Sequence, residues 1–129
     1  MEKNAYVTTI FGGDTYVGAA MVLAQSLRNH GAAAKLVIMA TEDVSAEAKT
    51  ALATFYDRVV DIGTIEVALP AQIHGGKRFK NMYTWLPRCF TKLHAFELEE
   101  FAKICLLDAD MVAVGNPDQI FELSAPAGI

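Results

Sequence analysis

The hydrophobic positions of the chain alternate between short continuous runs and longer stripes with helical spacing. Residues 5–10 (AYVTTI) are rich in β-branched and aromatic side chains and are followed by Gly12 and Gly13, which predicts a strand ending in a turn. The next segment carries a helical stripe at Val17, Ala20, Met21, Ala24 and Leu27. Because Gly31 can stop a helix, we expect this helix to end near His30.

The same alternation then repeats. Leu36–Ala40 is a short apolar run, and Ser45 is a suitable N-cap for a following helix. The apolar stripe of that helix is Ala48, Ala51, Leu52 and Phe55. Residues 59–62 (VVDI) predict a third strand. Since parallel strands need connections long enough to cross the sheet, the alternation predicts a doubly wound, Rossmann-like α/β fold with a mostly parallel sheet.

Periodicity fades between Gly63 and about Trp85, which predicts a long irregular stretch of the functional or mobile kind. The residues that mark it are Pro70, Gly75, Gly76, Lys77, Arg78 and Lys80.

The last part of the chain returns to regular patterns. A helix is predicted from near Cys89 to Glu100, after Pro87. Its apolar residues include Phe90, Leu93 and Phe96. Residues 103–107 (KICLL) predict a fourth strand, whose continuous apolar character suits the centre of a parallel sheet. Asp108 then stands at the carboxyl end of this strand.

Composition narrows the possible partners. A length of 129 residues fits one domain over residues 1–129, and 53% apolar residues fit a core between layers. The net charge of −4 gives no basic surface for nucleic acid or an anionic membrane. No apolar run approaches the roughly 20 residues of a spanning helix, and the N-terminus does not resemble a signal peptide. We therefore expect no membrane span and a cytoplasmic location.

Cysteines and histidines indicate neither a disulfide framework nor a zinc site. Cys89 and Cys105 are the two cysteines, and Cys105 lies within an apolar run, which favours free thiols over a disulfide. His30, His74 and His94 have no close metal-ligand spacing.

The strongest chemical signal is the pair Asp108 and Asp110, with Ala109 between them. In extended backbone their side chains would point to the same side, roughly 6.6 Å apart along the chain. Carboxylate oxygens suit manganese or magnesium, which keep positions open for substrate phosphates and water. Short acidic pairs in loops are usually just solvated, but this one lies between two apolar runs, where paired charges need a counter-ion.

Other residues could approach the same crevice, because ligands of open α/β sheets bind beyond the carboxyl ends of the strands. The segment Gly12–Asp14 lacks the spaced glycines of dinucleotide-binding proteins. It is either a turn that lets the backbone approach a ligand or a plain turn. Tyr16 could stack on a base or pack in the core.

Candidate residues farther along the chain also have both a functional and a structural interpretation. Lys92 and Arg88 could face a phosphate or be ordinary helix residues. His94 is more typical of a hydrogen-bonded packing residue than of a ligand-binding residue. Trp85 is more typical of a core residue than of an aromatic ring on which a sugar stacks.

Taken in order, several segments resemble the glycogenin-like enzymes of glycosyltransferase family 8. They are Ala5–Thr8, Tyr16, Leu23–Leu27, Phe90–His94, Leu106–Asp110 and the tail Asn116–Leu123. The resemblance covers nearly the whole chain. It implies a GT-A fold, a nucleotide-sugar donor that is usually a UDP-sugar, and a metal that is usually manganese. It also implies transfer of a hexose to a hydroxyl acceptor with retention of configuration.

The resemblance assigns roles residue by residue. Backbone at Thr8, Thr9 and Ile10, with Asp14 nearby, would face uracil and ribose, and Tyr16 would stack on the base.

The remaining positions would serve the diphosphate. Lys92, with Arg88 as a similar cation, would lie near the donor phosphates, and Asp108 and Asp110 would reach the metal. Ala109 would add a backbone contact. No catalytic residue is identified.

Two departures from the family pattern limit these expectations. The turn around residues 11–13 has one extra residue, which affects the assignments from Ile10 to Asp14. The sequence ends at Ile129, whereas family enzymes continue into an acceptor-binding half with a later histidine and a later acidic residue. We therefore expect the nucleotide-sugar-binding half of an enzyme.

Alternatives to a complete transferase stay open. A non-catalytic nucleotide-sugar-binding module is one, and half of a split enzyme is another, with a partner chain or a homo-oligomer supplying the acceptor half. The acceptor, whether protein tyrosine, glycan or lipid, is likewise open. A phosphatase-like or receiver-like domain is disfavoured, because residues 5–10 contain no acid.

Overall fold

The computed structural model describes residues 3–68 and 86–128. In chain order the elements are β1 (Asn4–Ile10), α1 (Val17–Asn29), β2 (Lys35–Thr41), α2 (Ala46–Leu52), β3 (Arg58–Ile62), the 3₁₀ helix η3 (Leu86–Glu97), β4 (Lys103–Leu106) and the 3₁₀ helix η4 (Asp118–Glu122). The order of strands and helices expected for a doubly wound fold is therefore confirmed.

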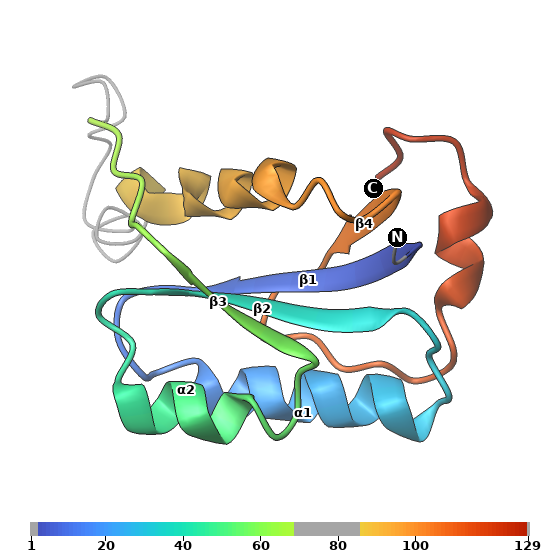
Figure 1. Cartoon of the computed structure of the whole chain (residues 1–129), viewed down its shortest axis with the longest axis horizontal. Helices are drawn as coiled ribbons and strands as arrows, with labels where there is room; N and C mark the ends of the chain where they lie inside the picture. Colours follow the sequence, from blue (N-terminus) through green and yellow to red (C-terminus); the bar gives the residue numbers. More distant parts are fainter. Residues whose placement is uncertain (1–2, 69–85, 129) are drawn as a thin grey trace, which may run out of the picture.

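All four strands are parallel, in the order β3-β2-β1-β4. Val7 of β1 is aligned with Val37 of β2 on one side and with Leu106 of β4 on the other. Helices α1 and α2 cover one face of the sheet, and η3 lies on the opposite face (Figure 1). This three-layer arrangement is Rossmann-like.

The two faces of the sheet bury two separate apolar clusters. Along β1, Tyr6 and Ile10 belong to the cluster beneath α1 and α2, while Ala5 and Val7 belong to the cluster beneath η3. β2 is buried on both faces along its whole length apart from Lys35. Coverage of both faces explains why these strands are continuous apolar runs instead of alternating patterns.

The predicted helix ends are confirmed where the sequence carried specific cap residues. Gly31 has a φ of +74°, and Ala32 donates a backbone hydrogen bond back to Leu27 at 3.1 Å, as expected for a glycine helix stop. At the start of α2, the Ser45 side chain accepts a hydrogen bond from the backbone amide of Ala48 at 3.1 Å.

The helix expected from near Cys89 to Glu100 differs from the prediction in bounds and in type. It covers Leu86–Glu97 as a 3₁₀ helix, so residues three positions apart lie above one another. Its apolar residues Phe90, Leu93 and Phe96 consequently share one side, and their exposed fractions are 46%, 46% and 80%. Thr91 and Ala95 are its buried residues.

The position of β4 also corrects an expectation. Its apolar run suggested the centre of the sheet, yet β4 is an edge strand among the described residues, and Leu106 is exposed. The other residues of β4 are only partly buried, so its apolar run indicated neither a strand covered on both faces nor one hydrogen-bonded at both edges.

Residues 63–68, at the start of the expected irregular stretch, have no regular secondary structure. The markers of that stretch lie outside the described residues: Pro70, Gly75, Gly76, Lys77, Arg78 and Lys80. His74 and Trp85 also lie outside them. In the part of the chain that the structure describes, no helix has the length and apolarity needed to cross a membrane.

Candidate functional site

The carboxyl ends of the two neighbouring strands β1 and β4 bring the predicted residues together. The Leu107 amide donates to the Val7 carbonyl at 2.9 Å, which continues the pairing of β4 with β1 by one residue. The chain therefore reaches Asp108 beside the Thr8–Thr9 end of β1. The predicted convergence of residues after Leu107 with the end of β1 is present in the fold.

The backbone conformation of the acidic pair differs from the extended one that we expected. Asp108 to Met111 form a turn in which the Met111 amide donates to the Asp108 carbonyl at 3.3 Å. Strand pairing has ended at Leu107, so nothing keeps these residues extended, and the spacing expected for a strand does not apply. Ala109 is 8% exposed and packs into the core, while Asp108 and Asp110 are exposed on either side of it.

Lys92 lies close to this turn. Its Nζ atom is 4.0 Å from Oδ1 of Asp108, and the two side chains are 50% and 76% exposed. An exposed pair of this kind contributes about 0–1 kcal/mol to stability, so both charges stay available to a ligand. Arg88 precedes Lys92 on η3 and is partly buried.

The predicted nucleoside-facing residues lie at the end of β1 and the start of α1. Thr8 and Ile10 are buried, so Ile10 can offer a ligand only its backbone. Within the described residues, the buried hydroxyls of Thr8 and Thr9 have no hydrogen-bond partner. Tyr16 immediately precedes α1, and its side chain is 49% exposed, which leaves a ring face available for stacking.

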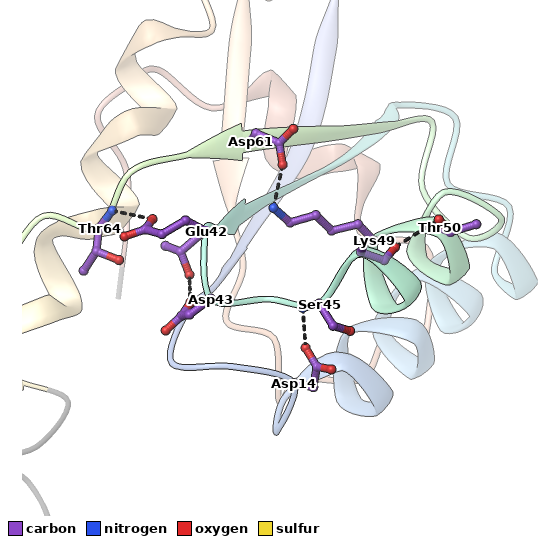
Figure 2. Close-up of polar contacts among 10 residues, drawn as sticks. Asp14, Glu42, Asp43, Ser45, Lys49, Thr50, Asp61 and Thr64 are labelled. Atoms are coloured by element: carbon purple, nitrogen blue, oxygen red, sulfur yellow. Dashed lines mark hydrogen bonds and ion pairs between the residues drawn. The ribbon is translucent and has the colours of Figure 1, made fainter.

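Asp14, also predicted at the donor, has a structural contact. One of its carboxylate oxygens accepts from the Ser45 backbone amide at 2.8 Å (Figure 2). Hydrogen bonding to Ser45 holds the pKa of Asp14 below its ordinary value. The carboxylate therefore joins the loop after β1 to the loop after β2, whatever else it binds.

Sequence reasoning missed two acidic residues at the same end of the sheet, Glu42 and Asp43. Glu42 accepts a hydrogen bond from the backbone amide of Thr64 at 3.2 Å. Asp43 accepts one from the hydroxyl of Thr41. The available signal was their place directly after β2, since loops at that edge are where ligand sites form.

The structure describes His94 and both cysteines. His94 has Nε2 at 2.9 Å from the Gly63 carbonyl oxygen and Nδ1 at 3.1 Å from Oε1 of Glu97, so it is a packing residue as expected. Cys89 and Cys105 are both free thiols, which confirms the preference against a disulfide.

The residues available to a metal ion are few. Among residues 3–68 and 86–128, no group of three or more histidine, cysteine or acidic side chains is placed to hold one. Asp108 and Asp110 provide two exposed carboxylates, and Lys92 approaches Asp108 only to 4.0 Å. Their oxygen chemistry fits a hard divalent cation that completes its shell with phosphate oxygens and water.

Comparison with known proteins identifies relatives along almost the whole chain. Residues 8–127 match the sequence model of the family described as Glycosyl transferase family 8. An uncharacterized protein of Acanthamoeba polyphaga mimivirus is 37% identical over 127 residues, which cover 98% of this chain and 43% of that protein.

The names of two other relatives state what kind of protein each one is. Glycogenin from Neurospora crassa is 39% identical over 94% of this chain and 17% of its own length. Inositol phosphorylceramide glucuronosyltransferase 1 of Arabidopsis thaliana is 32% identical over 95% of this chain and 21% of its own. The chain thus spans less than half the length of these relatives.

Proposed function

The chain belongs to glycosyltransferase family 8, and from this membership we propose that residues 1–129 form the nucleotide-sugar-binding domain of a metal-dependent glycosyltransferase. The donor is a UDP-sugar. The reaction transfers a hexose to a hydroxyl acceptor with retention of configuration. The family match covers the acidic turn, the lysine that approaches it and all of β1 from Thr8 onward.

The observation that carries the proposal is the approach of Lys92 to Asp108 across the end of the sheet. A lysine and a carboxylate 4.0 Å apart, both exposed, gain little from each other in water. The same two groups are complementary to a metal diphosphate, because the ammonium binds phosphate oxygens and the carboxylate binds the cation. Their placement is therefore better explained by a ligand than by stability.

The remaining site residues contact different parts of the donor. The β1 backbone at Thr8, Thr9 and Ile10 receives uracil and ribose, and the exposed Tyr16 ring stacks on the base. The unpartnered hydroxyls of Thr8 and Thr9 support this role, because buried hydroxyls favour a hydrogen-bond partner. Asp14 helps to shape the loop on this side.

The diphosphate lies at the other half of the site. Lys92 and Arg88 supply positive charge on the η3 side, and the Ala109 backbone lies between the two carboxylates. Asp108 and Asp110 would hold Mn²⁺ or Mg²⁺. When bound, such an ion would stabilise the negative charge that develops on the departing diphosphate.

A second candidate is a nucleotide-sugar-binding module, or half of a split enzyme, that does not transfer sugar by itself. The observation that favours it is the acidic pair, because the described residues add no third protein ligand to it. Incubation with labelled UDP-sugar, manganese and a panel of hydroxyl acceptors separates the two candidates. Labelled acceptor supports transfer, and tight UDP binding without labelled acceptor supports the module.

Calorimetric titration with UDP, in manganese and in excess chelator, tests the proposed site. Two carboxylates facing a diphosphate repel it unless a cation intervenes, so removing the metal should weaken binding about tenfold or more. The variant that replaces Asp108 and Asp110 by Asn should lose this metal dependence. Equal affinity of the wild type with and without chelator would remove the metal role from both residues.

A further inference from the structure

The acidic turn, Asp108–Met111, is fixed to the sheet at its start. The Leu107 amide donates to the Val7 carbonyl at 2.9 Å, and Ala109 is buried in the apolar cluster that α1 shares. Strand pairing has ended at this point, and residues 110–112 are exposed. The far side of the turn therefore depends on an attachment of a different kind.

That attachment is Ser26 of α1. The Ala113 amide donates to the Ser26 hydroxyl oxygen at 2.8 Å, and Ala113 is partly buried while both of its neighbours are exposed. The Asn116 side chain then donates to the Gly31 carbonyl at 3.2 Å, so the chain after the turn runs along α1 (Figure 1). We call the hydrogen bond between Ala113 and Ser26 the Ser26 anchor.

The Ser26 hydroxyl has a geometry that suits this contact. It donates to the Leu23 carbonyl at 2.8 Å within α1, and its side chain is buried. The bond to Leu23 uses the only hydroxyl proton and leaves the oxygen lone pairs free to accept. The Ala113 amide lies outside any helix or strand of the described residues, so it needs an acceptor of this kind.

The anchor has a consequence for cation binding, because Asp108 and Asp110 lie between it and the end of β4. A turn that is attached at both ends has already lost much of its conformational freedom. A turn that is attached at one end must lose that freedom when a ligand binds, and the loss weakens binding.

On the proposed function, the two carboxylates hold the divalent cation of the donor diphosphate. We infer that Ser26 is a positioning residue for this metal-dependent binding, which fixes the far end of the acidic turn so that Asp108 and Asp110 are presented together. It acts through the Ala113 amide and need not touch the cation or the donor.

Replacement of Ser26 by Ala and by Cys tests the inference, with UDP and uridine titrated separately in manganese. Ser26→Ala should weaken UDP about tenfold and leave uridine unchanged, because only UDP engages the acidic turn. Ser26→Cys nearly keeps the size and offers a weaker acceptor, so a loss of about threefold is expected. If Ser26→Ala fails to fold, the Cys variant provides the test.

Tyr56→Phe is the matched control. The Tyr56 hydroxyl donates to the Ala20 carbonyl at 2.6 Å, so this variant also removes a buried hydrogen bond to α1, but nearer the start of that helix. It should lower the thermal unfolding temperature and leave both affinities unchanged. If Tyr56→Phe weakens UDP as much as Ser26→Ala does, or if Ser26→Ala weakens uridine equally, the positioning role is wrong.

Hydrogen exchange provides a readout that needs no ligand. In Ser26→Ala the amides of Met111 and Ala113 should exchange faster relative to those of β2, and in Tyr56→Phe they should not. Unchanged exchange at both amides in Ser26→Ala would overturn the anchor. A wild type that binds UDP no more tightly with manganese than with chelator would overturn the proposed function, whereas metal-dependent binding that Ser26→Ala does not weaken would overturn only this inference.

Discussion

At the residue scale, the candidate site depends on a few exposed charges whose contacts add little to stability. Lys92 and Asp108 approach each other only to 4.0 Å, and both are largely in water. Buried polar residues such as Thr91 have closer contacts that belong to the fold. Substitution of an exposed site charge should therefore change ligand affinity without changing stability.

Lys92→Ala tests this separation. It should weaken UDP more than uridine, because a charge-assisted hydrogen bond to phosphate contributes about 1.5–3 kcal/mol and uridine has no phosphate. Calorimetry with each ligand measures the ratio, and thermal unfolding should show little change. Lys49→Ala is the control, since Lys49 pairs with Asp61 at 2.6 Å and has no proposed ligand role. Equal losses for both ligands would make Lys92 a structural residue.

At the element scale, η3 is held in place by the segment that follows β3. The two run in opposite directions: the Gly63 carbonyl contacts His94, Ile65 contacts Thr91, and the Val67 amide donates to the Pro87 carbonyl at 2.8 Å. Thr91 is fully buried, and its hydroxyl accepts from the Ile65 amide at 3.0 Å and donates to the Ile65 carbonyl at 3.3 Å. Lys92 follows directly, so this docking positions the lysine.

Thr91→Val should therefore destabilise the protein. The substitution keeps the side-chain shape but leaves part-buried polar groups of Ile65 without their partner, which costs about 1–3 kcal/mol. Urea unfolding measures the loss. Thr50→Val is a matched control, because the Thr50 hydroxyl donates to the Ala46 carbonyl on the exposed side of α2. A loss no greater than that of Thr50→Val would show that the Thr91 hydrogen bonds do not hold η3.

At the scale of the whole molecule, the chain after β4 returns to the opposite end of the sheet. The Ala113 amide donates to the Ser26 hydroxyl at 2.8 Å on the way. At η4, the two oxygens of Asp118 accept from the Tyr6 hydroxyl at 2.7 Å and from the Ala33 amide at 2.8 Å. Burial, and then Asp118, raise the pKa of Tyr6, so its hydroxyl stays protonated and donates.

Tyr6→Phe should loosen this return segment as well as lower stability. Loss of a hydrogen bond to a carboxylate costs about 1.5–3 kcal/mol, and the released segment includes residues 113–123. Hydrogen exchange should increase at the Ala33 amide and around η4 more than within β2. Tyr16→Phe, which changes an exposed hydroxyl, should alter neither stability nor exchange. Exchange that increases uniformly over the chain would argue against a local docking role.

The sequence by itself determined the elements that depend on local patterns. The β1 run, the α1 stripe with its Gly31 stop and the Ser45 cap were all predicted, because periodicity and caps act over a few residues. The order of strands and helices then led to the parallel α/β fold. The family was recognised from segments distributed over the whole chain, and residues 8–127 match it. The functions assigned to individual site residues stay predictions.

Tertiary structure decided the features that depend on contacts between distant residues. The 3₁₀ form of η3 accompanies docking against residues 63–67, and the Asp108–Met111 turn begins where pairing with β1 ends. The contact of Asp14 with the Ser45 amide had no local signal, because the two residues are 31 positions apart and meet only after β1 and β2 pair. Local free energies select helix or strand, but which loops share an edge of the sheet is fixed only when the strands assemble.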